Sequence, residues 1–443
     1  MTSTPEKTSS PLEETERGQT VQTVSPPPLA AHDPKAFPDG GLQAWLVVAG
    51  GFCAIFASFG WINCIGIFQN YYQSNLISSY SSSSVAWVPS TESFMMFFWG
   101  PVAGKLTDFW GPRVPIVIGT FLHVFGLMMA SISKEYYQIF LSQSVTSAIG
   151  CSFLFYPSMT ACASWFLRHR VLAIGIMASG SSVGGVVLPI MVNRLVDEVG
   201  FGWAMRSVAF LFLGLCTISI ITVKSRLPPS KQPFVLRDFI APYKEVPFLL
   251  LTIGVWITYI GGFIPFTFII VQARAQGMSD HLASYLVSIL NASSTFGRII
   301  PAHLGDVFGV FNVMIVLSLA GGLANIIFWL PTTVMSAQNT NALIIVFAIV
   351  YGFASGCIFS LVPAMIAKIS PDLSKLGVRT GSLYVVAATG VLIGSPIAGV
   401  ISSGDGNGFL GLTLFSGLLL VVGTVFLILS RVKLTGWKLM AKA

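Results

Sequence analysis

Apolar runs long enough to cross a membrane follow one another from Leu42 to the last part of this 443-residue chain. A spanning helix needs about 20 predominantly apolar residues to cross the ~30 Å hydrocarbon layer of a bilayer. Strands of a membrane barrel would be shorter and would alternate in polarity, so the runs favour an all-α bundle. We predict twelve spans, near residues 42–68, 85–106, 114–132, 136–161, 171–193, 203–223, 247–272, 282–304, 310–331, 341–367, 378–401 and 409–430.

The scarcity of charge excludes whole classes of protein. Only 9% of the residues are charged and 54% are hydrophobic, whereas about a quarter of an ordinary soluble chain is charged. A water-soluble enzyme or a nucleic-acid binder could not cover its surface with so few charges. The six cysteines lie inside apolar runs without CxxC spacing, and no phosphate-binding or nucleophile–base motif occurs. We therefore expect no metal, no cofactor and no enzymatic activity.

The positions of the basic residues indicate an orientation. Of the 24 Lys and Arg, nineteen fall in the segments that lie on the same side as the N-terminus, and four fall on the other side. An excess of Lys and Arg marks cytoplasmic segments, so both termini should be cytoplasmic and the number of spans even. The positive net charge is thus a topology signal and not a sign of nucleic-acid binding.

The polar segments divide the chain into five parts. The first segment is rich in Ser, Thr, Pro and Glu, which is typical of disorder, and it lacks the features of a cleaved signal peptide. The longest charged interruption separates six spans from six others. We expect a disordered cytoplasmic tail (1–41), a six-helix bundle (42–223), a cytoplasmic central loop (224–246), a second six-helix bundle (247–430) and a cytoplasmic tail (431–443).

The two halves share a short phrase after their second spans. The pattern Leu-x-Asp-x-x-Gly occurs at 106–111 and again at 304–309, an offset of 198 residues. Repeats in matching positions of two six-helix halves are typical of transporters, whose solute site lies between the halves near the middle of the bilayer.

The first copy belongs to a longer phrase, Gly-Lys-Leu-Thr-Asp-Phe-Trp-Gly-Pro-Arg at residues 104–113. It resembles the signature loop of the major facilitator superfamily, Gly-x-Leu-x-Asp-x-x-Gly-x-Arg. The resemblance implies a cytoplasmic latch in which Asp108 faces a helix N-terminus or a basic side chain; the alternative is a tight turn with solvated charges. Phe311 replaces the closing Arg in the second copy, so we expect that latch to be weaker. The candidate gating residues are Gly104, Asp108, Gly111, Arg113, Asp306 and Gly309.

Three further phrases resemble the monocarboxylate porter family within that superfamily, and the last resembles its fungal branch. They are Asp-Gly-Gly-Leu-Gln-Ala-Trp at 39–45, Trp-Phe-Leu-Arg-His-Arg-Val-Leu-Ala-Ile-Gly-Ile-Met-Ala-Ser-Gly at 165–180, and Ser-Ile-Leu-Asn-Ala-Ser-Ser-Thr-Phe-Gly-Arg-Ile at 288–299. Within the second phrase Arg168 and Arg170 sit at a helix end, where we expect them to anchor the helix to lipid phosphates.

Two charged residues lie inside the predicted spans, Glu92 and Arg298. An ionisable residue at membrane depth is a functional candidate. Arg298 matches the arginine that binds the substrate carboxylate in animal members of the resembled family, and a guanidinium fork suits a carboxylate. The alternative is that Arg298 snorkels to the nearby cytoplasmic end or supports the adjoining loop.

The sequence also departs from those animal members. Asn63 stands where they have a lysine and Ser294 where they have an aspartate, so both of their proton-linked groups are missing. Glu92 is a candidate substitute proton site; the alternative is a structural residue bonded to a hydroxyl. The candidate substrate and coupling residues are Arg298, Asn63, Ser294, Asn291 and Glu92.

Other residues inside the spans carry weaker indications. We expect His123 to be a hydrogen-bonded packing residue, because a lone histidine on an apolar helix seldom relays protons. Aromatic side chains are candidates for lining a cavity that takes a larger, partly aromatic solute. These candidates are Trp61, Tyr259, Phe263 and Tyr384.

Together these features predict a twelve-helix secondary transporter of the plasma membrane that moves a small organic, carboxylate-bearing solute by alternating access, with or without protons. Loss of the usual proton pair favours efflux of a specialised metabolite; import of a nutrient such as a monocarboxylate or vitamin is the alternative. A competing class is a non-transporting membrane sensor or scaffold. The expected partners are the solute and membrane lipids, with no nucleic acid and no obligate protein partner.

Overall fold

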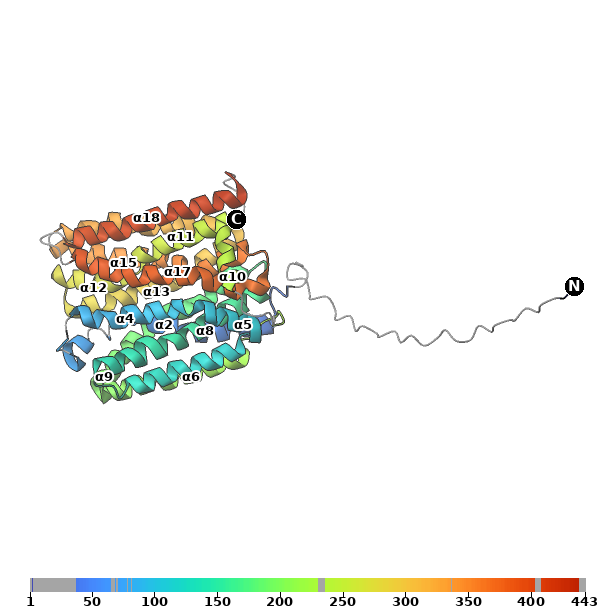
Figure 1. The fold of residues 1–443 in the computed structure, drawn as a ribbon. Helices are drawn as coiled ribbons and strands as arrows, with labels where there is room; N and C mark the ends of the chain where they lie inside the picture. The colour runs from blue at the N-terminus through green and yellow to red at the C-terminus, as the bar shows by residue number, and fades with distance from the viewer. Residues whose placement is uncertain are drawn as a thin grey trace.

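The computed structural model describes residues 2, 37–64, 68, 71–77, 79–80, 82–229, 236–335, 337–402 and 408–437. Every regular element among them is a helix, and the helices run along one another in a single bundle (Figure 1). Most of the N-terminal segment that the sequence predicts to be disordered, residues 3–36, lies outside the described residues.

The first half of the chain forms six spans. Gly200, with φ 79° and ψ 163°, interrupts the long helix α9 and divides it into the fifth and sixth of them. The elements are α1 and α2 (Leu42–Ala57 and Phe59–Ile62), α4 and α5 (Ser82–Phe98 and Gly100–Trp110), α6 (Arg113–Ala130), α7, η3 and α8 (Tyr136–Ile139, Phe140–Ser147 and Ala148–Trp165) and α9 (Arg170–Thr222), with the short η2 (Tyr72–Leu76) after the first span.

The second half repeats this arrangement after two short helices, α10 (Leu236–Ile240) and η4 (Ala241–Lys244), in the segment that the sequence predicts as a central loop. Its elements are α11 and α12 (Val246–Gly262 and Ile264–Ala275), α13 (Asp280–Phe308), α14, η5 and η6 (Val310–Ala324, Asn325–Trp329 and Leu330–Thr333), α15 and α16 (Ala337–Ser360 and Val362–Ile369), α17 (Leu376–Ser402) and α18 (Gly408–Thr435), with the short η7 (Leu373–Lys375) before α17.

Nine helical stretches of the described chain are long and apolar enough to cross a membrane unaided. The division of α9 at Gly200 makes them ten, and α4 with α5 and α13 complete the twelve predicted spans. These last two spans are less apolar because they carry polar groups such as Glu92, Asp108 and Arg298. The prediction of an all-α, twelve-helix membrane protein is confirmed.

Two pairs of spans join the halves: α9 packs along α13, and α17 packs along α4 and α5. Both contacts use glycine where the backbones meet. A Cβ atom built on Gly104 of α5 would lie only 2.6 Å from the carbonyl carbon of Gly377 in α17. Neither helix could come this close with a larger residue at that point.

The structure differs from the predicted tail boundary just before α1. Phe37 is buried, and Asp39 Oδ1 accepts hydrogen bonds from the backbone N–H groups of Leu167 and Arg168, at 2.6 and 2.7 Å. Residues 37–41 are therefore part of the folded bundle. The polar composition of the tail does not indicate this, because the Phe37 ring and the Asp39 carboxylate are enough to hold so short a segment in place.

Candidate functional site: a two-copy latch and a buried polar seam

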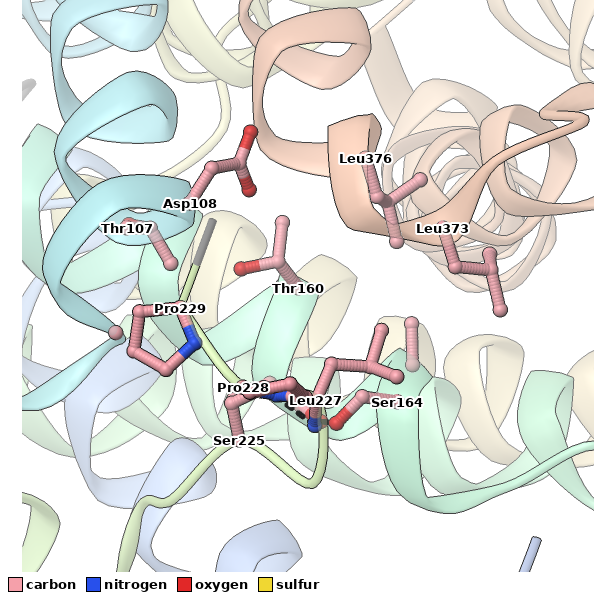
Figure 2. A pocket seen from close by; sticks show the side chains of 13 residues that line it. Thr107, Asp108, Thr160, Ser164, Ser225, Leu227, Pro228, Pro229, Leu373 and Leu376 are labelled. Atoms are coloured by element: carbon pink, nitrogen blue, oxygen red, sulfur yellow. Dashed lines mark hydrogen bonds between the residues drawn. The ribbon is translucent and has the colours of Figure 1, made fainter. Parts of the chain in front are cut away.

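Asp108 lies near the end of α5, at the end of the bundle where α5 and α10 are labelled in Figure 1; we call this the latch end. Its Oδ2 accepts a hydrogen bond of 3.1 Å from the backbone N–H of Val378, in the first turn of α17. Figure 2 shows the Asp108 carboxylate directed at that helix. A carboxylate at a helix N-terminus is stabilised by free N–H groups and by the helix dipole.

The other residues of the first signature loop shape this contact. Gly111 ends α5 with φ 80°, a left-handed conformation that favours glycine. Arg113 begins α6, is exposed to the surroundings of the protein and forms no ion pair within the described part of the chain. Of the two expected partners of Asp108, the helix N-terminus is therefore the one that the structure provides.

The second copy of the phrase makes the equivalent contact with the two halves exchanged. Asp306 of α13 accepts hydrogen bonds of 3.0 and 2.9 Å from the backbone N–H groups of Val171 and Leu172, in the first turn of α9. Gly309 ends α13 with φ 94°. The sequence predicts a weaker second latch, because Phe311 replaces the closing Arg. In the structure Asp306 accepts hydrogen bonds from two backbone donors, and its partner is again a helix N-terminus.

A pocket adjoins the first latch, with an empty volume of about 470 Å³ that includes its open mouth. Figure 2 shows its wall: Asp108 and Thr160 face Leu373 and Leu376 across it, and Pro228 and Pro229 line another side. The pocket thus lies where first-half residues approach the start of α17.

The two arginines expected to anchor the α9 end to lipid differ in their surroundings. Arg168 is exposed, as lipid binding requires. Arg170 is buried: its Nε donates to the carbonyl of Phe166 at 2.8 Å, and its guanidinium carbon lies 5.5 Å from the centre of the Phe37 ring. For Arg170 the anchoring prediction is wrong, because the segment before α1 covers it and leaves no path to a headgroup.

Arg298 lies inside α13, where it is only 3% exposed. Its Nε donates to Ser182 Oγ of α9 at 2.7 Å, Nη1 donates to the Ala178 carbonyl at 3.4 Å, and Ser182 in turn bonds Ser294 at 3.1 Å. No carboxylate forms an ion pair with Arg298 within the described residues. The side chain therefore points across the α9–α13 contact and does not snorkel to the latch end.

Asn63 and Asn291 continue the same line of polar groups toward the other end of the bundle. Asn63 Nδ2 lies 3.2 Å from the Ser181 carbonyl of α9 and 3.4 Å from Asn291 Oδ1 of α13. Asn291 also donates to the Val287 carbonyl at 3.0 Å. The structure thus brings four of the five predicted site residues into one seam between the halves. We call this the polar seam: Asn63, Ser181, Ser182, Asn291, Ser294 and Arg298.

An aromatic cluster lies against the seam. Phe59 of α2 is at its centre, and the Arg298 guanidinium carbon lies 5.7 Å from the centre of the Phe59 ring. Both halves contribute rings, three of which are the cavity candidates Tyr259, Phe263 and Tyr384. The Tyr384 hydroxyl is buried without a hydrogen-bond partner among the described residues. The members of the cluster are Phe59, Phe97, Phe155, Tyr156, Tyr259, Phe263, Phe359 and Tyr384.

Glu92, the fifth predicted site residue, is fully buried away from the seam. Its Oε1 accepts from the indole N–H of Trp61 at 2.6 Å, and its Oε2 accepts from Gln143 Nε2 at 3.0 Å. Gln143 is held in turn by the hydroxyl of Tyr72. Trp61 therefore serves Glu92 and is not part of the aromatic cluster, which differs from its predicted place. Both donors to Glu92 are N–H groups, whereas the alternative structural interpretation of Glu92 has a hydroxyl as its partner.

Some participants could not have been identified from the sequence. Ser182 and Gln143 occupy ordinary positions in apolar runs, and their roles depend on helices far along the chain. His123 bonds Ser147 at 2.8 Å and the Ala57 carbonyl at 3.0 Å, in keeping with the packing role predicted for it.

A helical bundle with two exchanged carboxylate latches at one end, and with a buried arginine between its halves that has no carboxylate partner among the described residues, is typical of alternating-access membrane transporters. The family profile described as Major Facilitator Superfamily matches residues 50–269 and 251–439. The chain belongs to this superfamily.

Three similar proteins come from fungi. The chain is 49% identical to "MFS transporter asaE" of Aspergillus flavus over 410 residues, which cover 92% of this chain and 91% of the relative. It is 42% identical to the "Fujikurins efflux protein" of Gibberella fujikuroi, with 91% and 86% covered. It is 35% identical to "Aspyridones efflux protein apdF" of Emericella nidulans, with 91% and 80% covered. These relatives are transporters, a class without enzymatic activity.

Solved structures agree with this fold. The outward conformation of the transporter FucP matches with a TM-score of 0.67 at 14% identity, over 88% of this chain and 98% of that chain. At this identity the likeness concerns the fold alone.

Proposed function

We propose that this protein exports an anionic specialised metabolite by alternating access. The observation that carries the proposal is Arg298, a buried guanidinium between the halves that has hydroxyl and carbonyl partners but no carboxylate within the described chain. Burying an unpaired charge is costly, and a solute carboxylate would offset that cost in bidentate geometry. The names of the relatives, several of which are efflux proteins, support export.

The contacts at the latch end support a state closed on that side. Asp108 and Asp306 each tie one half to the first turn of a helix in the other half, so opening this end breaks both contacts. We propose that the latch end faces the cytoplasm, that both termini lie there and that the protein works in the plasma membrane. The distribution of Lys and Arg supports this orientation.

We propose two kinds of role for the five predicted site residues: four bind the solute and one couples transport to protons. Arg298 binds the solute anion, and Asn63, Asn291 and Ser294 supply neutral polar contacts in the same seam. Glu92 is proposed as a proton-coupling group because it is fully buried and separate from the solute. We place the chain in the fungal branch of the monocarboxylate porter family, on the three phrases that resemble it.

Comparison of metabolites inside and outside cells tests the direction of transport. Cells that make the metabolite and carry the gene should retain less of one acidic metabolite than cells without it, and Arg298→Ala should behave like the deletion. Accumulation of an external acid only in cells that carry the protein would instead establish import. A protein that leaves all solutes unchanged but alters the signalling of a partner would be a sensor, and the proposal would fail.

A further inference from the structure

One helical turn of the first span, separated from the rest of that span by an irregular residue, contacts both Glu92 and the polar seam. The turn comprises α2 and Asn63, and Ser58 separates it from α1 with φ −89° and ψ −76°. In a helix, residues two apart point about 200° apart, and residues four apart share a face. Phe59 and Asn63 are thus expected on one face of the turn and Trp61 on the opposite face.

The contacts follow this geometry. Phe59 faces Arg298, and Asn63 faces Asn291 and the Ser181 carbonyl, so this face lies against the polar seam. Trp61 is turned away from the seam and donates its indole N–H to Glu92 at 2.6 Å. Trp61 therefore belongs to a helical turn whose opposite face contacts Arg298, and a displacement of the Trp61 backbone also shifts that face.

The two hydrogen-bond donors around Glu92 favour the ionised form of the carboxylate. Each oxygen accepts one N–H, from Trp61 and from Gln143, and an indole N–H can only donate. A proton on either oxygen occupies one of its acceptor positions and removes the negative charge, so it weakens the hydrogen bonds that the carboxylate accepts from Trp61 and Gln143. The Gln143 side chain is fixed by Tyr72, whereas Trp61 sits on the separated helical turn.

No cationic side chain forms an ion pair with Glu92 in the part of the chain that the structure describes. His123 of α6 packs edge-on to Trp61 at 6.3 Å, and both of its ring nitrogens are occupied by Ser147 and the Ala57 carbonyl. The titratable groups that face Glu92 from the first span, η2 and α8 are Cys64, Tyr72 and Cys151.

We propose that Trp61 is the positioning residue that transmits the protonation state of Glu92 to the polar seam around Arg298. The inference rests on the proposed function, in which this protein is a transporter and Glu92 its coupling group. Trp61 releases Glu92 when the carboxyl gains its proton, and the turn of Phe59 and Asn63 shifts against the seam. Solute affinity then changes with the proton on Glu92, which is the condition for coupled transport.

The second half contains a matched control. Trp329 is fully buried and donates its indole N–H to Gln272, a neutral amide that cannot titrate. Trp329→Phe removes an equivalent hydrogen bond from an equivalent environment without touching a carboxylate. A purely structural role of indole hydrogen bonds would show equally in both tryptophans.

The experiment measures flux of each member of a panel of aromatic monocarboxylic acids, and the accompanying proton movement, in proteoliposomes over a series of pH gradients. For one proton per solute, wild-type accumulation should change about tenfold per pH unit. Trp61→Phe and Glu92→Gln should both lose this dependence, and the double variant should resemble either single one. Trp329→Phe should keep the wild-type dependence.

Replacement of Trp61 by benzothienylalanine, which has the tryptophan shape but no N–H, covers the case in which Trp61→Phe does not fold. A wild-type pH dependence in both Trp61 variants would overturn the inference while leaving the coupling role of Glu92 intact. Wild-type flux that is independent of pH would refute the coupling role itself and this inference with it. Absence of any wild-type flux would refute the proposed function.

Discussion

Gly104→Ala should weaken the closed state of the latch end. The added Cβ would lie 2.6 Å from the carbonyl carbon of Gly377, against about 3.5 Å for an ordinary contact between carbon atoms. The obstacle is backbone and not a flexible side chain, so α5 and α17 must separate by roughly 1 Å. That separation also lengthens the 3.1 Å bond from Val378 to Asp108.

The cost can be bounded from the contact itself. Overpacking of a tight contact costs about 1–3 kcal/mol, and the open state does not bear this cost because the two helices are apart there. The ratio of open to closed molecules should therefore rise by about 5- to 150-fold. Gly399→Ala is the matched control, because Gly399 lies in the same helix α17 and its added Cβ meets nothing within 4 Å.

Hydrogen exchange of the Val378 amide reports this equilibrium directly, since that amide is the donor to Asp108. Exchange in a peptide that contains Val378 should accelerate in Gly104→Ala by the same factor as the population shift and stay unchanged in Gly399→Ala. Equal protection in wild type and Gly104→Ala would show that the close contact does not hold the latch end shut, and the reasoning would be refuted.

Two further substitutions test the supports of the latch helices. Asp39→Ala removes the acceptor for two backbone N–H groups before α9 and should lower the free energy of unfolding by about 1–2 kcal/mol in thermal melts in detergent; an unchanged melting temperature would contradict its capping role. Glu245→Gln removes the charge of the carboxylate that pairs with the buried Arg379 at 2.8 and 2.7 Å and should cost about 1–3 kcal/mol. Asp238→Asn, whose partner Lys375 is more exposed than Arg379, should cost under about 1 kcal/mol. Equal losses in Glu245→Gln and Asp238→Asn would contradict the claim that burial makes the Glu245–Arg379 pair the stronger of the two.

The sequence predicts the spans well because membrane thickness imposes a length and polarity that are visible in any apolar run. It also identifies Asp108 and Asp306, because a repeated phrase stands out without knowledge of its partners. The partners themselves could not be predicted: the N–H that Asp108 accepts belongs to Val378, 270 residues along the chain, and packing alone brings them together.

Burial explains the differences between prediction and structure. Arg170 has the sequence context of a lipid anchor, yet Phe37 from a polar segment covers it. Trp61 is an aromatic residue of the kind expected to line a cavity, yet after the irregular residue Ser58 its side chain faces Glu92. Such outcomes depend on which face of a helix meets which neighbour, and apolar runs with little periodicity do not specify that face.

The central claim is that Arg298 binds the anionic group of the exported solute. The most direct measurement is flux into proteoliposomes of a panel of aromatic monocarboxylic acids alongside their methyl esters, with wild type, Arg298→Lys and Arg298→Ala compared. The account predicts protein-dependent flux of at least one acid but not of its ester. It predicts a loss of about 10- to 100-fold in apparent affinity in Arg298→Lys, which keeps the charge but not the fork, and no flux in Arg298→Ala. Equal transport of acid and ester, or unchanged kinetics in Arg298→Ala, would contradict it.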